Sequence, residues 1–414
     1  MTKYLKDFVK YSSKRISADE ITLENYVTTD NLLQNKQGKT NVENLPPNGG
    51  NVTAYEKGDI LISNIRPYLK KLWFATQSGG SSADVLTLKV KPGFDQKFIY
   101  YSVFRDVFFE HMMNGSKGTK MPRGDKNQIL DFPIPNFSIP TQKSIAKVLS
   151  ALDTKIELNN RINRELEAMA KTLYDYWFVQ FDFPNEQDKP YKSSGGKMVY
   201  NAELRREISE GWTVKKLSEI ANITMGQSPE GSSYNDDGIG EIFFQGSTDF
   251  GWRYPTIRQY TTQPSRKAKA GDILLSVRAP VGALNIADND CCIGRGLAAL
   301  NSKSGYDSYL YYVMEYFKQI FDNRNNAGTT FGSITKDDLF SLKLVYPKDD
   351  ILKKYNQIVY KYNQTILNNH KQNQQLTELR DWLLPMLMNG QVTVKEAEES
   401  LSMAAEPSVE YKKG

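Results

Sequence analysis

Residues 140–178 read PTQKSIAKVLSALDTKIELNNRINRELEAMAKTLYDYWF. Apolar residues recur in this stretch at alternating spacings of four and three, the pattern of a long helix with one buried seam. Such a helix is roughly 58 Å long at about 1.5 Å per residue, long enough to hold two globular parts apart. The alternative is a long core helix inside one domain. The seam consists of Ile145, Leu149, Leu152, Ile156, Asn159, Asn163, Leu166, Ala170, Leu173 and Trp177.

Composition restricts the class of protein. A chain of 414 residues with 39% hydrophobic and 24% charged residues has room for two or three globular domains. Its two cysteines, Cys291 and Cys292, are adjacent, which excludes a disulfide framework, and its two histidines lack metal-ligand spacing. Nowhere does an apolar run reach the length of a membrane span. We therefore expect a cytoplasmic protein with no metal and no membrane partner.

The chain repeats itself once. Residues 57–63, KGDILIS, recur as residues 270–276, AGDILLS, 213 positions later. Tyr100 and Tyr101 recur as Tyr311 and Tyr312, 211 positions later. Offsets that drift so little over a long distance indicate a duplication with small changes in loop length.

The long helix is part of the duplication. A second seam with the same alternation of four and three runs from Ile351 to Leu383, and the amides at 159 and 163 recur at 369 and 373. Amides at facing positions of two paired helices fix the register, because a slipped pairing leaves them against hydrocarbon. We expect Asn159, Asn163, Asn369 and Asn373 to do so. The second seam is Ile351, Tyr355, Ile358, Tyr362, Thr365, Asn369, Gln372, Leu376, Leu379 and Leu383.

Connectivity favours an antiparallel pair. The second globular part begins near the C-terminal end of the first helix and finishes at the N-terminal start of the second helix, and these ends are adjacent only in an antiparallel arrangement. We therefore predict an α+β fold in which two similar mixed parts are separated by an antiparallel pair of coiled-coil helices with pseudo-two-fold symmetry. The expected segments are a globular part (1–139), a spacer helix (140–180), a linker (181–212), a second globular part (213–347), a second spacer helix (348–390) and a flexible tail (391–414).

Three stretches in this order carry a resemblance to a known family. They are residues 139–146, IPTQKSIA, which run on to Leu158-Asn159-Asn160, then Gly211-Trp212, and residues 379–390, LRDWLLPMLMNG. The chain resembles, over nearly its whole length, the specificity subunit of type I restriction-modification systems. The resemblance implies that the globular parts are target recognition domains, each of which reads one half of a split sequence in double-stranded DNA. It also implies that the helices set the gap and dock two methyltransferase subunits, through which restriction subunits join.

The resemblance implies a chain without catalysis or a cofactor of its own, with S-adenosylmethionine expected on the methyltransferase partner. The sequence agrees, because it has no amino-methyltransferase motif and no phosphate-binding loop. Two alternatives belong to other classes: a coiled-coil adaptor without a nucleic-acid role, and a self-contained half of a DNA-modifying enzyme. Salt-dependent DNA binding separates the first from a DNA reader, and S-adenosylmethionine binding to the isolated chain identifies the second.

Candidate DNA-binding residues in the first copy lie in two places. A glycine-broken loop, 117–126, offers cations for phosphates and a hydroxyl for base edges. A second patch follows the KGDILIS strand, although its arginine is answered by Arg278 near a proline, so this pair is either structural or DNA-binding. The first-copy candidates are Lys117, Thr119, Lys120, Arg123 and Lys126 in the loop, and Arg66, Lys70 and Lys71 in the second patch.

In the second copy the stretch 225–229, MGQSP, resembles a glycine-serine-proline loop found early in these recognition domains. The first copy has Lys10 to Arg15 there instead, so the role is not transferred to it. Further polar and basic residues after the aromatic strand are plausible lining residues. The second-copy candidates are Gln227, Ser228, Tyr234, Thr248, Arg253, Arg258, Arg278 and Arg295.

Overall fold

The computed structural model describes residues 3–47, 49–118, 120–326 and 333–405. The chain divides into two compact units. Unit 1 comprises Met1–Asn159 and Lys371–Gly414, and unit 2 comprises Asn160–His370. Helices α5 (Ile139–Tyr174) and α9 (Asp349–Asn389) therefore each contribute one half to unit 1 and the other half to unit 2.

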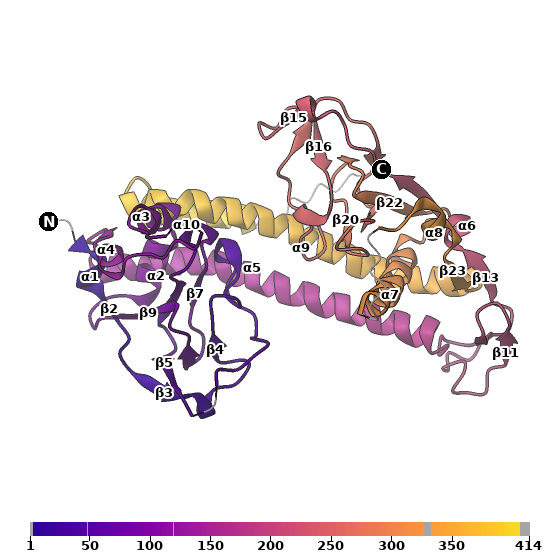
Figure 1. Cartoon of the computed structure of the whole chain (residues 1–414), viewed down its shortest axis with the longest axis horizontal. Helices are drawn as coiled ribbons and strands as arrows, with labels where there is room; N and C mark the ends of the chain where they lie inside the picture. The colour runs from indigo at the N-terminus through magenta and orange to yellow at the C-terminus, as the bar shows by residue number, and fades with distance from the viewer. Residues whose placement is uncertain (1–2, 48, 119, 327–332, 406–414) are drawn as a thin grey trace. The chain divides into compact units, whose positions relative to one another are not determined.

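Unit 1 contains a four-stranded antiparallel sheet in the order β2-β9-β6-β7 (Figure 1). Its inner strand β6 is buried along its whole length, as its apolar sequence predicts. A second sheet has the order β3-β5-β8-β4, and β1 pairs with β10. The strands are β1 Lys3–Tyr4, β2 Val9–Tyr11, β3 Arg15–Ser17, β4 Tyr26–Val27, β5 Asn51–Tyr55, β6 Ile60–Ser63, β7 Leu72–Phe74, β8 Gly79–Ser81, β9 Val85–Val90 and β10 Pro133–Ile134.

Helices cover the first sheet of unit 1 and join it to the helix pair. Asp95 begins α2 by accepting a hydrogen bond from the Phe98 backbone N–H at 2.9 Å. Phe98 and Phe104 are buried in the same core as Leu149 of α5 and Leu383 of α9. Each such side chain contributes about 1.5–3 kcal/mol on burial. The short helices are α1 Leu5–Phe8, α2 Gln96–Phe104, α3 Asp106–Asn114, α4 Lys126–Leu130 and α10 Val394–Ala405.

Unit 2 repeats this plan next to its own halves of the helices. Its first sheet has the order β14-β22-β19-β20, the same connectivity as the first sheet of unit 1, and β13 pairs with β23. Its second sheet differs, with five strands in the order β15-β17-β16-β21-β18. The strands are β13 Thr213–Lys216, β14 Ala221–Met225, β15 Tyr234–Asn235, β16 Glu241–Phe244, β17 Tyr260–Thr261, β18 Lys267–Ala268, β19 Ile273–Ser276, β20 Leu284–Ile286, β21 Cys291–Ile293, β22 Leu297–Ser302 and β23 Lys343–Tyr346, and the helices are α6 Leu217–Ile220, α7 Asp307–Asn326 and α8 Lys336–Ser341.

The repeated Gly-Asp pair has a local physical reason. Gly58 and Gly271 have φ angles of 93° and 96°, which a residue with a Cβ rarely adopts. The following aspartate is buried in each copy and accepts a backbone N–H from three residues earlier, at 2.8 Å for Asp59 and 2.9 Å for Asp272. Both residues thus form the turn that enters the central strand, and this requirement explains why they occur in both copies.

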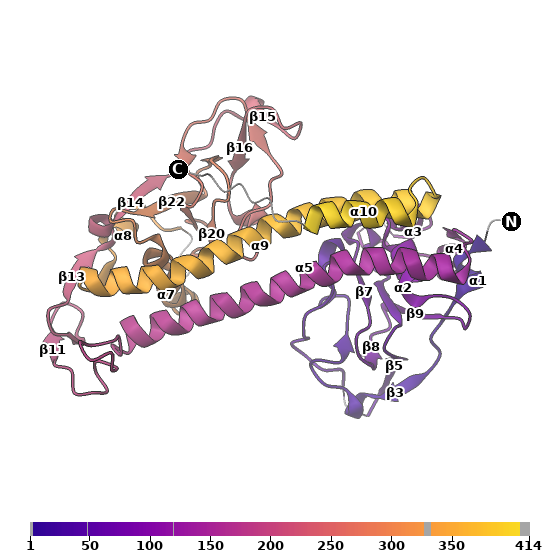
Figure 2. The same ribbon diagram turned by 180° about the vertical axis from the view of Figure 1, so that it is seen from behind.

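The helices are antiparallel within each unit, as the connectivity predicted (Figures 1 and 2). In unit 1, the Asn159 Nδ2 group donates to Asn373 Oδ1 at 2.9 Å and to Gln372 Oε1 at 2.8 Å. In unit 2, the Asn369 Nδ2 group donates to Asn163 Oδ1 at 2.8 Å. The four asparagines therefore face one another in two pairs, Asn159 with Asn373 and Asn163 with Asn369.

The second seam is shifted from its predicted position over part of α9. Ile358 is 37% exposed and Thr365 is exposed, whereas their neighbours Val359 and Ile366 are fully buried. Apolar residues at 352, 355, 359, 362 and 366 alternate by three and four and reach Asn369, Asn373 and Leu376 in phase. The prediction of Ile358 and Thr365 as seam residues was wrong, because two interleaved apolar patterns overlap in this part of the helix.

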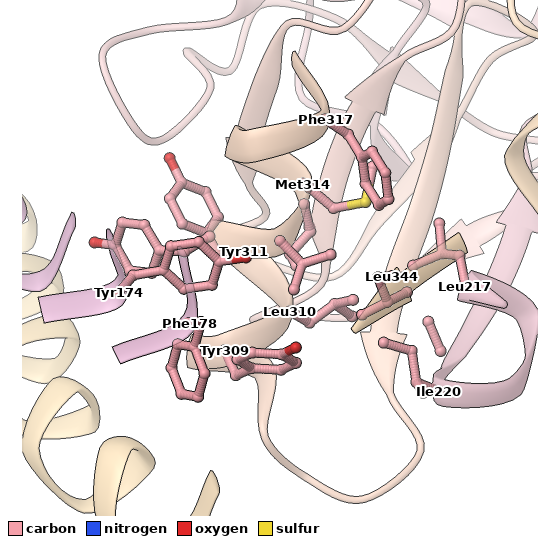
Figure 3. Close-up of a cluster of buried hydrophobic side chains, with 14 of the residues drawn as sticks. Tyr174, Phe178, Leu217, Ile220, Tyr309, Leu310, Tyr311, Met314, Phe317 and Leu344 are labelled. Carbon is pink, nitrogen blue, oxygen red and sulfur yellow. The ribbon is translucent and has the colours of Figure 1, made fainter. Parts of the chain in front are cut away.

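The end of α5 packs on an aromatic cluster in unit 2. A π-helical turn, Asp175–Val179, follows α5 and brings Phe178 to 4.9 Å from Tyr309 of α7, measured between ring centroids. Figure 3 shows Tyr174, Phe178 and Tyr309 gathered here, with Leu310 and Leu344 beyond them. This cluster joins the first helix to the sheet of unit 2.

Two segments that were expected to be irregular are folded. In the expected linker, β11 (Met198–Asn201) and β12 (Arg206–Ser209) form a hairpin, and Phe183 stacks on Trp212 with ring centroids 4.8 Å apart. In the expected tail, α10 buries Ala397 in the core of unit 1. The glycine and serine content of the first segment and the weak periodicity of the second concealed these few apolar anchors. Residues 406–414 lie outside the described part of the chain.

Within the described ranges, no helix combines the length and the apolar character that crossing a bilayer requires.

We predict that Asn163 and Asn369 are energetically coupled. Asn163→Leu alone removes the acceptor of the Asn369 amide and should lower the free energy of unfolding by about 1–2 kcal/mol. The double change Asn163→Leu with Asn369→Leu should recover most of that loss, because neither member of this pair then leaves an unpaired amide in the seam. Thermal unfolding of the two single variants and the double variant measures the coupling. Additive losses would show that the two amides do not depend on each other.

Candidate nucleic-acid interface

The predicted basic loop of unit 1 is fastened to the turn that follows β6. Lys117 and Arg123 exchange two backbone hydrogen bonds of 3.0 Å, which close the loop on itself. The Arg66 N–H donates to Pro122 O at 2.8 Å, and the Gly124 N–H donates to Asn64 O at 3.1 Å. The two predicted patches of the first copy therefore meet in one place. We call Arg66, Lys117, Lys120, Arg123 and Lys126, all of which are exposed, the basic cluster.

The charged side chains of the basic cluster differ in how closely they are paired with carboxylates. The Lys117 side chain is 87% exposed and lies 3.9 Å from an Asp125 carboxylate oxygen, whereas Arg123 forms a 2.7 Å ion pair with Asp84. Asp125 begins α4, and the backbone N–H groups of Gln128 and Asn127 lower the pKa of its carboxyl group. Arg123 is therefore held in place by its ion pair, while Lys117 is available to an anion.

Lys70 and Lys71 are engaged in the fold, in contrast to the rest of the predicted patch. Lys70 forms a 2.8 Å ion pair with Asp106 of α3, to which Lys36 also binds at 2.8 Å. The Lys71 ammonium donates to the Thr29 carbonyl oxygen, and burial lowers its pKa. Both lysines therefore hold the turn that contains Arg66. Thr119, the remaining first-copy candidate, lies outside the described residues.

In unit 2, three loops bring four polar residues together. The amide group of Gln245, which follows β16, donates to Ser228 Oγ at 2.9 Å, and the same hydroxyl accepts the Arg295 backbone N–H at 3.3 Å. The Gln227 N–H donates to Ile293 O at 3.0 Å. We call Gln227, Ser228, Gln245 and Arg295 the amide cluster. It offers amide, hydroxyl and guanidinium groups, which are the groups that read base edges.

Glycine makes the close approach of these loops possible. A Cβ atom added at Gly226 would lie 2.2 Å from the Gly294 carbonyl oxygen, and one added at Gly296 would lie 2.8 Å from the Gln245 carbonyl oxygen. Real Cβ atoms do not approach backbone atoms so closely. The loops are therefore packed backbone against backbone, which fixes the side chains that project from them.

Four other second-copy candidates have separate positions. Tyr234 is half-buried and donates to the Pro229 carbonyl oxygen at 2.9 Å, so it supports the loop of Ser228. Thr248 is exposed, and Arg258 is 65% exposed and bonded to Asp249 at 2.9 Å. Arg278 is exposed and pairs through its backbone with Ser333. These residues are not joined to the amide cluster by any hydrogen bond in the described residues.

Arg253 is a correction to the predicted interface. Its side chain is only 1% exposed and forms an ion pair with Glu167 of α5. Its Nη2 group donates to Asn363 Oδ1 of α9 at 2.8 Å, and its guanidinium lies 4.6 Å from the Tyr311 ring centroid. A guanidinium buried among these partners cannot line a DNA surface, so Arg253 is part of the fold.

Sequence reasoning missed Gln245. The signal that could have found it is the Gly294-Arg295-Gly296 sequence, which implies a close backbone approach by another strand end. Among the described residues, no group of three or more His, Cys, Asp or Glu side chains is placed to hold a metal ion. Cys291 and Cys292 are both buried as free thiols in β21.

Comparison with known proteins identifies the family. The model of the type I restriction modification DNA specificity domain matches residues 1–168 and again residues 209–378. These two matches cover most of the chain and correspond to its internal repeat. The chain belongs to this family, which is that of the specificity subunits of type I restriction-modification systems.

Individual relatives agree. The putative type I restriction enzyme MjaX specificity subunit of Methanocaldococcus jannaschii is 34% identical over 66% of this chain, and the alignment covers 62% of that relative, which is less than two thirds of its length. The MjaIX specificity subunit of the same organism is 24% identical over 87% of this chain and 83% of its own length. The HindI specificity subunit of Haemophilus influenzae is 23% identical over 94% of this chain and 98% of its own length.

A solved structure supports the fold. The S subunit of a type I restriction-modification system from M. genitalium has a TM-score of 0.57 to this chain at 17% identity, and the alignment covers 94% of this chain and 96% of that structure. The two proteins share a fold at an identity that says nothing of individual binding residues.

We predict that the basic cluster contributes phosphate contacts. Lys117→Ala should weaken DNA binding about equally for all sequences and reduce the slope of log affinity against log salt by about 1, the effect of one lost phosphate contact. Fluorescence anisotropy with labelled duplexes at several salt concentrations measures this slope. Lys57→Ala removes an exposed lysine elsewhere in unit 1 and is the control. An unchanged slope for Lys117→Ala would remove this residue from the interface.

Proposed function

We propose that this chain recognises a double-stranded DNA target that is split into two halves, one read by each unit, as the specificity subunit of a type I restriction-modification complex. The observation that carries the proposal is the double family match, which coincides with a duplicated fold. A subunit of this family is a recognition protein without catalysis of its own.

The two units suit two different half-sites. Their first sheets have the same strand order, while their second sheets differ in strand number and order. The exposed groups differ as well, because the basic cluster of unit 1 is rich in cations and the amide cluster of unit 2 combines two amides, a hydroxyl and one arginine. Cations bind phosphates of any sequence, and amides and arginine make bidentate contacts with particular bases. We expect unit 2 to read its bases through the amide cluster.

The proposed partners follow from the family. Two methyltransferase subunits bind this chain, and restriction subunits join the complex through them. S-adenosylmethionine is bound by the methyltransferase subunits and supplies the methyl group. The role of this chain is to place both methyltransferase subunits on one target.

The proposal is tested by adding the chain to its cognate methyltransferase subunits and mapping methylated positions on genomic DNA. One split sequence should be methylated, and the methyltransferase subunits alone should not methylate it. Equal methylation with and without this chain would contradict the proposal. Binding of S-adenosylmethionine by the isolated chain would point instead to an enzyme half.

We predict that Arg295 and Gln245 determine the second half-site. Arg295→Ala or Gln245→Ala should relax discrimination at one or two base pairs in one half of the target, at a cost of about 1–3 kcal/mol per lost base contact. The other half should remain as selective as before. Methylation of a library in which both half-sites are randomised gives this profile, with Glu207→Gln on β12 as the control. Equal loss of selectivity in both halves would contradict the assignment.

A further inference from the structure

Arg253 connects three elements of unit 2. It lies between the turn that contains Thr248 and strand β17. Its guanidinium group pairs with Glu167 of α5, donates to Asn363 of α9 at 2.8 Å and covers the ring of Tyr311 of α7. One side chain from the globular part thus contacts both long helices at once.

The partners of Arg253 are themselves held. The Tyr312 hydroxyl of α7 donates to Glu167 Oε1 at 3.0 Å, and the Asn363 amide donates to Ser308 Oγ at 3.1 Å. Residues of α7 therefore orient Glu167 and Asn363 independently of Arg253. We call Arg253, Glu167 and Asn363, with Tyr312 and Ser308 behind them, the arginine lock.

The loop that carries Arg253 has further attachments. The Ile286 N–H donates to the Arg253 carbonyl oxygen at 2.8 Å, and the ring centroid of the next residue, Tyr254, lies 4.5 Å from that of His370 on α9. His370 Nε2 lies 3.4 Å from Asp288 Oδ2. These contacts oppose sliding of the loop along α9.

Burial makes the arginine lock selective for one arrangement. A guanidinium 99% removed from solvent is costly unless a counter-ion and hydrogen-bond acceptors stand at the right places. The planar fork of arginine reaches a carboxylate and an amide in fixed directions, which a flexible lysine cannot reproduce. A small rotation of the globular part on the helices would separate the charges while they remain shielded from water.

Unit 1 has a comparable contact, in which the arginine lies on a long helix. Asp153 of α5 accepts the Tyr101 hydroxyl at 2.7 Å and the Arg380 guanidinium at 2.9 Å, and Arg380 lies on α9. Tyr101 and Tyr312 are equivalent in the internal repeat. The carboxylate and the tyrosine thus occur in both units, but only in unit 2 does the arginine come from the globular part.

We propose that Arg253 and Glu167 are positioning residues, which fix the orientation of the globular part of unit 2 on its helix pair and thereby the separation of half-sites that the protein accepts. The inference rests on the proposed recognition of a split target. Insertion of one base pair moves a half-site by about 3.4 Å and rotates it by roughly a tenth of a turn around the DNA axis. A rigidly held globular part cannot follow that rotation, whereas a loosened one can.

The test uses the full chain with its methyltransferase subunits and three DNA substrates. The substrates carry the mapped target with its natural gap, with one base pair more and with one base pair less. The measured quantity is the initial rate of methylation of each altered substrate divided by that of the natural one. The lock variants are Arg253→Lys, Glu167→Gln and Asn363→Ala, and the matched controls are Arg266→Lys and Glu207→Gln, which change exposed residues of unit 2.

The wild type and the controls should strongly prefer the natural gap. Each lock variant should raise the relative rate on at least one altered substrate by about tenfold, the effect of one lost charge-assisted hydrogen bond. A merely structural role would lower all three rates by a common factor and leave the ratios unchanged, and this result would overturn the inference. Unchanged ratios together with unchanged rates would overturn it as well.

Two further results distinguish a folding defect, a wrong proposed function and a wrong inference from one another. Asn363→Ala keeps the buried ion pair and removes the hydrogen bond from Arg253 together with the one to Ser308, so it tests the inference if the charge variants are insoluble. If the wild type fails to methylate the natural target, the proposed function is wrong, and the inference fails with it. If the wild type is selective and Asn363→Ala retains its ratios, only the inference fails.

Discussion

The antiparallel contact between α5 and α9 is the constraint on which both units depend. Each unit contains one half of each helix, so neither core is complete without both. In unit 1, Leu149 and Leu383 share a core with the aromatic residues of α2, and in unit 2 the Tyr355 hydroxyl donates to the Ala170 carbonyl oxygen across the pair. The asparagines hydrogen-bond in two pairs, and a slip of one helical turn would place an amide against hydrocarbon. Register and core formation are therefore set together.

Divergence between the two units is located where the helices impose no requirement. The sheets β2-β9-β6-β7 and β14-β22-β19-β20 pack in the same cores as the helix halves and have kept one strand order. The second sheets share three strands, β4-β8-β5 and β16-β21-β18, with one parallel and one antiparallel pair in each, and differ in the remaining strands. The proposed reading of two different half-sites would use this division between constant and variable parts.

The sequence predicted the features that depend on local rules. The repeat of KGDILIS as AGDILLS and the seam of α5 are each a pattern within one stretch of sequence, so both were found. The seam of α9 was misplaced at Ile358, because Ile358 and Val359 are both apolar and periodicity cannot rank them. Arg253 was assigned to DNA as a basic residue after the aromatic strand, and its burial depends on Glu167, which is distant in sequence. Long-range partners of this kind leave no local signal.

Several of the predicted DNA-binding cations are paired or buried inside the fold, which lowers the positive charge available at the interface. Lys70, Lys71 and Arg253 are neutralised or buried, and Arg123 is paired with Asp84. Fewer of the predicted cations therefore remain exposed and unpaired for phosphates, and the net charge of the whole chain is only +5. Non-specific affinity rises with the number of phosphate contacts, so each unit alone is expected to bind weakly. When two weak readers are linked on one chain, the second binds at a high effective concentration once the first is bound. For the proposed split target, tight binding would then require both half-sites on one DNA, which would make the target selective without a strongly basic surface.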